Sequence, residues 1–401
     1  MDSLELIRGL ARPSPTKIVL LVIDGLGGLP HPKTGKTELE TAQTPNLDKL
    51  AAAGICGLTD PISPGITPGS TPGHLALFGY DPVEFNIGRG VVEAVGIDFA
   101  LKPEDIAARG NFCTVDDKGL ITDRRAGRIP TEKCAELCRL LSGLVIDGVK
   151  LSVLPVREHR FVIVFQGKGL APDVSDSDPQ QAGVAPKAVI ALNPKAKPMA
   201  VVANKFVEQA RAILDKHHPA NMLLLRGFSQ RPQLPTMPEV YKLKPAAVAA
   251  YPMYRGLAKL VGMQVLDTGA TIAEEMATLK ENYNAYDFFF LHVKKTDSTG
   301  EDGDFERKTK LIEEADKSIP VLTGLKPDVI VVTGDHSTPA TIKGHSWHPL
   351  PVVLCSKWCR PDRVDEFSES ACISGGLGRF PATQIMPLAM AHALKLAKFG
   401  A

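Results

Sequence analysis

Short apolar runs alternate with amphipathic helical patterns along much of the chain. The run at residues 17–23, KIVLLVI, is continuously apolar and rich in β-branched residues, which is typical of a strand buried on both faces of a sheet. Similar runs lie at residues 161–165, 222–225, 287–293, 328–332 and 351–354. Helical patterns lie at residues 44–53, 131–142, 203–217, 271–283, 304–324 and 384–399. Strands that alternate with helices predict an α/β fold with a mostly parallel sheet.

The middle of the chain has a different character. Residues 98–245 contain charged turns, an Asp- and Pro-rich loop at 171–179 and a Pro-rich run at 232–238. We therefore expect one domain formed by residues 1–97 and 246–401, with a smaller α+β domain of residues 98–245 inserted into it. Glycine and proline are frequent, at 35 and 32 residues, so many shaped loops must connect these elements.

Charge and composition exclude several classes of protein. Lys and Arg total 46 and Asp and Glu total 45, a net charge of +1, so no basic excess favours a nucleic-acid partner. No apolar stretch approaches the roughly 20 residues of a membrane span. Residues 1–17 carry charges and lack the apolar core of a secretory signal. We expect a cytoplasmic protein whose partner is a small molecule, while its oligomeric state stays open.

Polar residues follow the first apolar run and precede a predicted helix near residue 70. Asp24 comes directly after KIVLLVI and is followed by Gly-Leu-Gly-Gly. Taken alone, it reads better as a turn or helix-capping residue. Ser70 lies in the turn T-P-G-S-T-P-G-H, where a helix N-terminus would favour an alkoxide or a phosphate. For Ser70 alone, a simple cap is an equally good interpretation.

Two later strands end in further acids and histidines. Asp297 follows the apolar segment at 287–293, and Asp335 and His336 follow the run at 328–332. His345 comes shortly afterwards. Because ligand sites in parallel sheets collect beyond the carboxyl ends of strands, these residues are expected to meet. His292 lies within a strand and is interpreted as a packed or hydrogen-bonded core histidine.

The combined pattern is more specific than any of its parts. The candidate metal ligands are Asp24, Ser70, Asp297, Asp335, His336 and His345. Mixed carboxylate and imidazole ligands suit Mn²⁺ or Zn²⁺, and this number of ligands exceeds one tetrahedral site. Two adjacent metal ions serve in-line phosphoryl transfer, and a metal-bound serine hydroxyl becomes a nucleophile.

The chain resembles a known family, the archaeal-type 2,3-bisphosphoglycerate-independent phosphoglycerate mutases of the alkaline phosphatase superfamily. The resemblance covers nearly the whole sequence. Matching stretches include VIDGLGG at 22–28, TPNLDKLAAAG at 44–54, GSTPGHLALFGYDP at 69–82, RGNFCTV at 109–115, DRRAGR at 123–128, HRFVIVF at 159–165, VSDSDP at 174–179, YPMYRGLAKLVGM at 251–263 and TGDHSTP at 333–339. It implies an alkaline-phosphatase-like, mostly parallel sheet with helices on both faces and an inserted α+β domain.

The resemblance also implies a catalytic centre. Ser70 would be the nucleophile that becomes phosphoserine. Asp24, Ser70, Asp335 and His336 would hold one metal ion, and Asp297 and His345 would hold a second. Its third ligand, four residues after Asp297, is commonly histidine in the family, whereas this chain has Glu301. We expect Glu301 to act as a ligand with altered metal preference, and loss of the second metal is the competing outcome.

By the same resemblance, two divalent cations would serve as cofactors, Mn²⁺ first, with Mg²⁺, Zn²⁺ or Co²⁺ as alternatives, and no 2,3-bisphosphoglycerate would be needed. The implied reaction interconverts 3-phosphoglycerate and 2-phosphoglycerate within one visit to the site. Arginine suits the phosphate and carboxylate groups of this small phosphorylated substrate. The candidate substrate-binding residues are Arg124, Arg125, Arg128, Asn111, His159, Arg160, Arg226 and Arg255, with Arg109 and Asp176 in matching segments.

Three alternatives keep the same scaffold. A homoserine-kinase-like phosphotransferase or a metal-dependent phosphatase would change only the phosphate acceptor. A non-catalytic binder of phosphorylated metabolites would have a decayed site, and Glu301 is the only residue that favours it.

Overall fold

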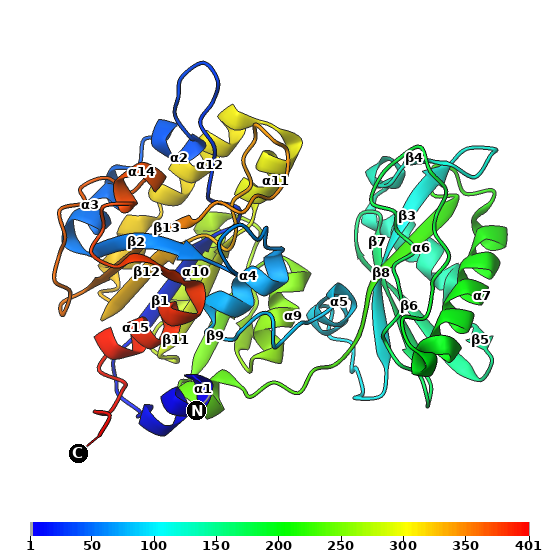
Figure 1. Ribbon diagram of the computed structural model, residues 1–401, viewed down its shortest axis with the longest axis horizontal. Helices are drawn as coiled ribbons and strands as arrows, with labels where there is room; N and C mark the ends of the chain where they lie inside the picture. The colour runs from blue at the N-terminus through cyan, green and yellow to red at the C-terminus, as the bar shows by residue number, and fades with distance from the viewer. Residues whose placement is uncertain (1–2, 401) are drawn as a thin grey trace. The chain divides into compact units, whose positions relative to one another are not determined.

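The computed structural model describes residues 3–400, which form two compact units (Figure 1). Unit 1 comprises Met1–Asn86, Leu234–Tyr254 and Ala258–Ala401, and unit 2 comprises Ile87–Gln233 and Arg255–Leu257. The division into domains at residues 98 and 245 stays a prediction.

An eight-stranded sheet forms the centre of unit 1, in the order β10-β9-β11-β1-β12-β13-β2-β14. Strand β1 lies at its middle and pairs in parallel with both neighbours, β11 and β12. Only the two pairings of β13, with β12 and β2, are antiparallel. The mostly parallel sheet expected from the sequence is therefore confirmed. The strands are β1 Ile18–Ile23, β2 Ile55–Asp60, β9 Pro245–Val248, β10 Gln264–Leu266, β11 Phe288–Val293, β12 Val329–Thr333, β13 Leu350–Ser356 and β14 Gly378–Pro381.

Both faces of β1 are buried, which explains its unbroken apolar sequence. Val19, Leu21 and Ile23 join a core cluster with residues of α3, α10, α12 and α13. The alternate residues point to the other face, where Phe290 of β11, the partner of Leu20, packs against Phe78 with ring centroids 4.9 Å apart. The helices concerned are α3 Pro45–Ala53, α4 Ser70–Leu77, α10 Ile272–Asn282, α12 Phe305–Asp316 and α13 Ile319–Gly324.

Unit 2 is built on an antiparallel sheet, in the order β4-β3-β7-β6-β5, with β8 paired to β3. The apolar runs at residues 161–165 and 222–225 lie in β7 and β8. A continuous apolar run reports burial on both faces and not strand direction, so sequence alone could not place them in a separate antiparallel sheet. The elements are β3 Ile106–Val115, β4 Ile121–Asp123, β5 Val145–Ile146, β6 Val149–Arg157, β7 Arg160–Gln166, β8 Met222–Gln230, α5 Arg89–Gly96, α6 Thr131–Leu141 and α7 Lys197–Leu214.

Several helix boundaries differ from those expected. The pattern at 304–324 forms two helices, α12 and α13, because Pro320 occupies the first turn of a new helix. The C-terminal pattern at 384–399 ends as a helix at His392. The remaining helices are α1 Ser3–Leu10, α2 Glu38–Thr41, α8 Met237–Tyr241, α9 Pro252–Leu260, α11 Lys295–Asp302, α14 Glu369–Cys372 and α15 Ile385–His392, with short 3₁₀ turns at Ala126–Arg128, Pro194–Ala196 and Ala382–Gln384. Among residues 3–400, no helix has the length and apolar character needed to cross a bilayer.

Candidate metal centre

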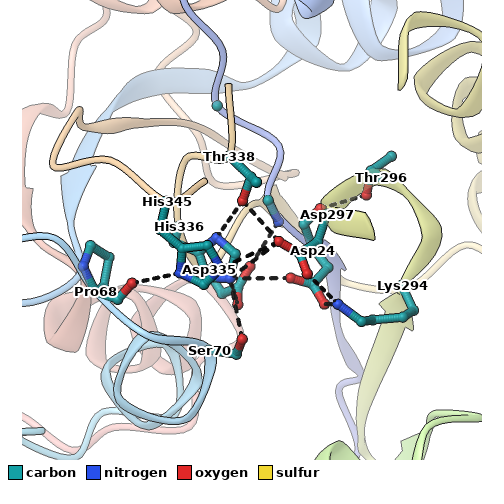
Figure 2. A network of polar contacts seen from close by, with 12 residues as sticks. Asp24, Pro68, Ser70, Lys294, Thr296, Asp297, Asp335, His336, Thr338 and His345 are labelled. Atoms are coloured by element: carbon teal, nitrogen blue, oxygen red, sulfur yellow. Dashed lines mark hydrogen bonds and ion pairs between the residues drawn. The ribbon is translucent and has the colours of Figure 1, made fainter. Parts of the chain in front are cut away.

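The carboxyl ends of three adjacent parallel strands bring the candidate ligands together. Asp24 follows β1, Asp297 lies in the first turn of α11 after β11, and Asp335 and His336 follow β12. Figure 2 shows these side chains converging with Ser70 and His345. Their ligand atoms form two groups, each within 4.8 Å: Asp24, Asp335 and His336, and Asp297, His336 and His345.

Asp24 is fully buried and uses its two oxygens differently. Oδ2 accepts a hydrogen bond from the Tyr254 hydroxyl, and it lies 3.2 Å from His292 Nε2 and 3.0 Å from Lys294 Nζ. Oδ1 has no hydrogen-bond partner among residues 3–400 and faces His336 Nε2 at 3.4 Å. Burial favours the neutral acid, but the charge of Lys294 and the contact with His292 outweigh it and hold the pKa of Asp24 well below its usual range. Asp24 is therefore a carboxylate with one free oxygen.

Asp335 has a similar division of roles. Its Oδ1 accepts a hydrogen bond of 3.1 Å from the backbone N–H of Gly25. Its Oδ2 lies 3.2 Å from His336 Nε2 and 3.1 Å from His74 Nδ1. Helix α4 comes so close to this loop that a Cβ on Gly73 would lie 2.3 Å from the Asp335 carbonyl oxygen. Only glycine fits there.

Hydrogen bonds fix the tautomer of His336. The Thr338 hydroxyl donates to Asp297 Oδ1 at 2.9 Å, so its oxygen is left to accept from His336 Nδ1–H, also at 2.9 Å. The Nε2 lone pair of His336 then points at the Asp24 and Asp335 oxygens and at Ser70 Oγ, 3.3 Å away. A histidine that is held through one nitrogen and presents the other is the usual arrangement of a metal ligand.

His345 is held in the same way and pairs with Asp297. Its Nδ1 donates to the Pro68 carbonyl at 2.9 Å, and its Nε2 lies 3.5 Å from Asp297 Oδ1. Burial lowers the pKa of His345, but the hydrogen bond and charge of Asp297 raise it overall to about 9. The pKa of Asp297 is lowered, since Lys294 and His345 outweigh burial and the nearby charge of Asp24. Without a metal ion, this pair is an imidazolium next to a carboxylate.

These residues fit a divalent cation. Two buried carboxylate oxygens, on Asp24 and Asp335, lack hydrogen-bond partners within the described chain. Both face the free nitrogen of His336. Leaving such atoms unpaired costs about 1–3 kcal/mol each, and more for charged groups. Carboxylate and imidazole ligands in this arrangement suit Mn²⁺, Zn²⁺ or Mg²⁺.

Ser70 is the first residue of α4 and is buried, with 4% of its surface exposed. Its hydroxyl lies beside the free His336 nitrogen at the end of the helix that carries partial positive charge. This position favours a negatively charged oxygen on Ser70, whether as an alkoxide or within a phosphate ester.

Glu301 occupies a different environment from the other candidate ligands. It lies in α11, one turn after Asp297, and its side chain is exposed. Neither ligand group found in the described chain includes it.

Lys294 is the main functional candidate that sequence reasoning missed. Its ammonium contacts Oδ2 of both Asp24 and Asp297, whereas His336 and His345 face the Oδ1 atoms of these carboxylates. The two carboxylates raise the pKa of Lys294 although burial lowers it, so the group stays charged. Tyr254, His74 and Thr338 were also missed. The signal for Lys294 was its position directly after a buried strand, as for Asp24.

The candidate substrate-binding residues lie in unit 2, except that Arg255 joins this unit from α9. Arg109 and Asn111 of β3 are buried, and Arg109 Nε donates to Asn111 Oδ1 at 3.2 Å. Arg226 lies opposite Arg109 on β8. Burial and the nearby charges of Arg89 and Arg109 lower the pKa of Arg226 to about 10. Arg109 Nη1 lies 3.4 Å from the Glu93 carboxylate and Arg226 Nη1 lies 3.8 Å from the Asp178 carboxylate, so these buried and half-buried arginines lie beside acids.

The rest of this set lies around the same strands. Arg124 makes two hydrogen bonds to the Asp178 carboxylate, of 3.3 and 2.8 Å, while Arg125 and Arg128 are exposed. Burial, together with the charges of Arg160, Arg109 and Arg125, lowers the pKa of His159 to about 3, so its ring is neutral. Asp176 accepts a hydrogen bond from the backbone of Gly227, next to Arg226.

Comparison with known proteins identifies close relatives. A family model described as 2,3-bisphosphoglycerate-independent phosphoglycerate mutase matches residues 51–221. A protein of Thermotoga petrophila, named as a probable enzyme of this kind, is 50% identical over 402 residues, covering 100% of both chains. The structure of the PH0037 protein from Pyrococcus horikoshii has a TM-score of 0.83 and 31% identity, covering 97% of this chain and 100% of that one. The cofactor-independent phosphoglycerate mutase from Thermoplasma acidophilum has a TM-score of 0.65 and 32% identity, covering 94% and 100%.

Proposed function

The chain belongs to the family of 2,3-bisphosphoglycerate-independent phosphoglycerate mutases, and we propose that it interconverts 3-phosphoglycerate and 2-phosphoglycerate through a phosphorylated Ser70. One observation carries the proposal. The Ser70 hydroxyl, at the start of α4, lies 3.3 Å from the free nitrogen of His336, which also faces the unpartnered oxygens of Asp24 and Asp335.

We assign the metal ligands as follows. Asp24, Ser70, Asp335 and His336 hold one divalent cation, and Asp297 and His345 hold the second, with Mn²⁺ as the preferred ion. Such ions, when bound, lower the pKa of a coordinated hydroxyl and neutralise charge on phosphoryl oxygens. The hydrogen bonds to Thr338 and Pro68 hold the Nδ1 atoms of His336 and His345, so that their Nε2 atoms face the centre.

The chemistry at Ser70 balances without another reactant. Ser70 Oγ forms a bond to phosphorus while the bond between phosphorus and the 3-oxygen of the substrate breaks. The serine proton ends on that 3-oxygen, which leaves glycerate and phosphoserine. The 2-hydroxyl of glycerate then takes the phosphoryl group, and its proton returns to Ser70. Water must be excluded throughout, since it would hydrolyse the phosphoserine.

We propose that arginines of unit 2 bind the anionic groups of the substrate. Arg109, Arg226 and Arg124 are the strongest candidates, because at most 30% of each side chain is exposed. Arg125, Arg128, Arg160, Arg255, His159 and Asn111 complete the proposed set. The division into a catalytic domain of residues 1–97 and 246–401 and a substrate-binding domain of residues 98–245, and a cytoplasmic location, are part of the same proposal.

The decisive assay uses purified protein with Mn²⁺ and 3-phosphoglycerate, without 2,3-bisphosphoglycerate. The proposal predicts formation of 2-phosphoglycerate and its loss in Ser70→Ala. Ser63→Ala, in a nearby loop outside the site, is the matched control and retains activity. Release of inorganic phosphate without 2-phosphoglycerate would instead indicate a phosphatase.

Glu301 is proposed as the third ligand of the second metal ion, although its side chain is exposed without the metal. A carboxylate there is a harder ligand than imidazole, so the site should favour Mn²⁺ or Mg²⁺ over Zn²⁺. Glu301→Ala should lose one bound ion by elemental analysis, while Glu306→Ala, an acid of the next helix, should lose none. Unchanged stoichiometry in Glu301→Ala removes this residue from the site.

A further inference from the structure

Lys308 of α12 is a fully buried lysine that belongs to neither group of ligands. Its ammonium donates to the carbonyl oxygens of Gly27, at 3.0 Å, and Thr338, at 2.9 Å. The nearest acid is Glu38, whose Oε1 lies 3.8 Å away. Burying an ammonium group costs several kcal/mol unless its hydrogen bonds and charge are satisfied, so this placement needs an explanation.

The two acceptors belong to the two loops that carry the proposed ligands. Gly27 lies three residues after Asp24, and Thr338 lies two residues after His336. The same Gly27 carbonyl accepts a second hydrogen bond, of 3.0 Å, from the backbone N–H of Thr338. Lys308 therefore binds the point where the loop after β1 crosses the loop after β12.

Thr338 connects the crossing of the two loops to both ligand groups through direct hydrogen bonds. Its carbonyl is held by Lys308, while its hydroxyl contacts Asp297 and His336. There is little room for Thr338 to move, because a Cβ on Gly300 of α11 would lie 2.2 Å from the Thr338 carbonyl oxygen. A displacement of Thr338 would therefore disturb His336, which belongs to both groups, and Asp297, which belongs to the second.

Two carboxylates, one on the buried Glu38 and one on the half-buried Glu369, hold the continuation of both loops. Glu38 Oε1 accepts a hydrogen bond of 2.7 Å from the backbone N–H of Ala340, two residues beyond Thr338. Glu369 accepts from the backbone N–H of Gly28 and from the Thr37 hydroxyl, both at 2.8 Å. The charges of both acids counter the effect of burial, which lowers the pKa of Lys308.

We propose that Lys308 is a positioning residue: by fixing the crossing of the two loops, it sets the spacing of Asp24, Asp297 and His336 and thereby the affinity of the metal centre. The inference rests on the proposed metal centre. It differs from a purely structural role, in which removal of the ammonium would lower stability without a specific loss of metal binding.

Lys395 provides a matched control. It is also fully buried, and its ammonium donates to the Ser14 carbonyl at 2.7 Å and to the Asp287 carboxylate at 3.1 Å. Neither acceptor belongs to the loops after β1 or β12. Lys395→Met and Lys308→Met thus remove the same group from two buried sites, and only Lys308 binds the loops that carry the proposed ligands.

The test is calorimetric titration of the metal-free full chain with Mn²⁺, together with its melting temperature. We expect Lys308→Met to weaken Mn²⁺ binding by about 10–100-fold, the usual effect of losing a residue behind a metal ligand. Lys395→Met should lower the melting temperature while its Mn²⁺ affinity stays within about twofold of wild type. Excess Mn²⁺ should restore turnover in Lys308→Met.

Each outcome is decisive. Wild-type Mn²⁺ affinity in folded Lys308→Met, or an equal loss in Lys395→Met, overturns the positioning role and leaves the metal centre intact. Failure of the wild-type chain to bind Mn²⁺ contradicts the proposed centre instead. If Lys308→Met does not fold, Glu38→Gln takes its place: it keeps the acceptor for Ala340 but removes the charge facing Lys308, and we expect weaker Mn²⁺ binding. Unchanged affinity in Glu38→Gln would then overturn the inference.

Discussion

The Lys294 ammonium lies between two carboxylates of the proposed metal centre, those of Asp24 and Asp297. It bridges Oδ2 of Asp24 and Oδ2 of Asp297, which belong to different ligand groups. In Lys294→Met the side chain keeps a similar length and its packing near the Tyr254 ring, but the positive charge is lost. Asp24 would then lose its nearest positive charge whenever the metal is absent, while Asp297 keeps only the imidazolium of His345.

The size of the effect follows from the contact distance. At 3.0 Å from Asp24, an ion pair in an effective dielectric of about 20 is worth on the order of 5 kcal/mol before desolvation and screening are subtracted. Breaking one partner of a buried pair typically costs about 3–5 kcal/mol. Since one quarter of the Lys294 side chain is exposed, we expect a loss near the lower end, about 3 kcal/mol, in the metal-free protein.

Bound divalent cations supply the missing positive charge, so they should recover most of this loss. If the substitution destabilises the metal-free protein by about 3 kcal/mol more than the metal-bound protein, the variant binds metal roughly 100-fold more tightly than wild type. This follows because about 1.4 kcal/mol corresponds to a factor of ten in affinity. Lys294→Met is therefore expected to raise Mn²⁺ affinity while lowering the melting temperature of the metal-free protein.

The assay is Mn²⁺ titration and thermal unfolding of wild type, Lys294→Met and Lys205→Met. Lys205 forms an exposed pair with Asp147, in which both side chains are about half exposed, so its replacement should change neither quantity measurably. Weaker Mn²⁺ binding in Lys294→Met would refute the reasoning, because it would mean that the ammonium orients the carboxylates rather than competing with the metal for them.

Three further predictions follow from single residues. Burial raises the pKa of Glu275 to about 8, above its unfolded value near 4.3. Between these two pH values the unfolded chain binds fewer protons than the folded chain, so the free energy of unfolding falls as pH rises. Glu275→Gln should therefore gain stability over wild type progressively from pH 5 to pH 8 in thermal melts. His345, with a pKa of about 9 in the metal-free protein, must lose its proton to bind metal, so Mn²⁺ affinity should fall about tenfold per pH unit below 9. Calorimetry in buffers of different ionisation enthalpy would measure the proton release. An affinity that does not change with pH would contradict this prediction. Gly73→Ala should push α4 away from the Asp335 carbonyl and reduce turnover far more than Gly69→Ala, whose Cβ would have room; equal activities would show that the close approach is unimportant.

Much of the centre was predictable because its residues are tied to strand ends. An apolar run identifies a buried strand, and neighbouring parallel strands place their carboxyl ends at one edge. Asp24, Asp335 and His336 could therefore be grouped by their positions in the sequence alone, and the family expected from the motifs is confirmed by relatives of 50% identity. The roles of the individual residues in binding metal and substrate stay predictions.

The residues that were missed depend on contacts between loops, which no local pattern encodes. Thr338 matters because its hydroxyl joins Asp297 of α11 to His336 of its own loop. The sequence weakly indicates that Lys308 is buried, because it lies three and four residues before Leu311 and Ile312, on the buried face of α12. In unit 2, only the strands β7 and β8 were indicated by apolar runs. Their direction was not readable, because a run of apolar residues looks the same in a parallel and an antiparallel sheet.

The central claim is that the phosphoryl group passes through Ser70. The most direct measurement mixes the protein with Mn²⁺ and 3-phosphoglycerate, quenches it in acid during turnover, and locates phosphate by mass spectrometry of the proteolytic peptides. Phosphoserine is expected at Ser70 in the wild-type protein and none at this position without substrate. Formation of 2-phosphoglycerate at the full rate by Ser70→Ala, or phosphate found only on another residue, would contradict it.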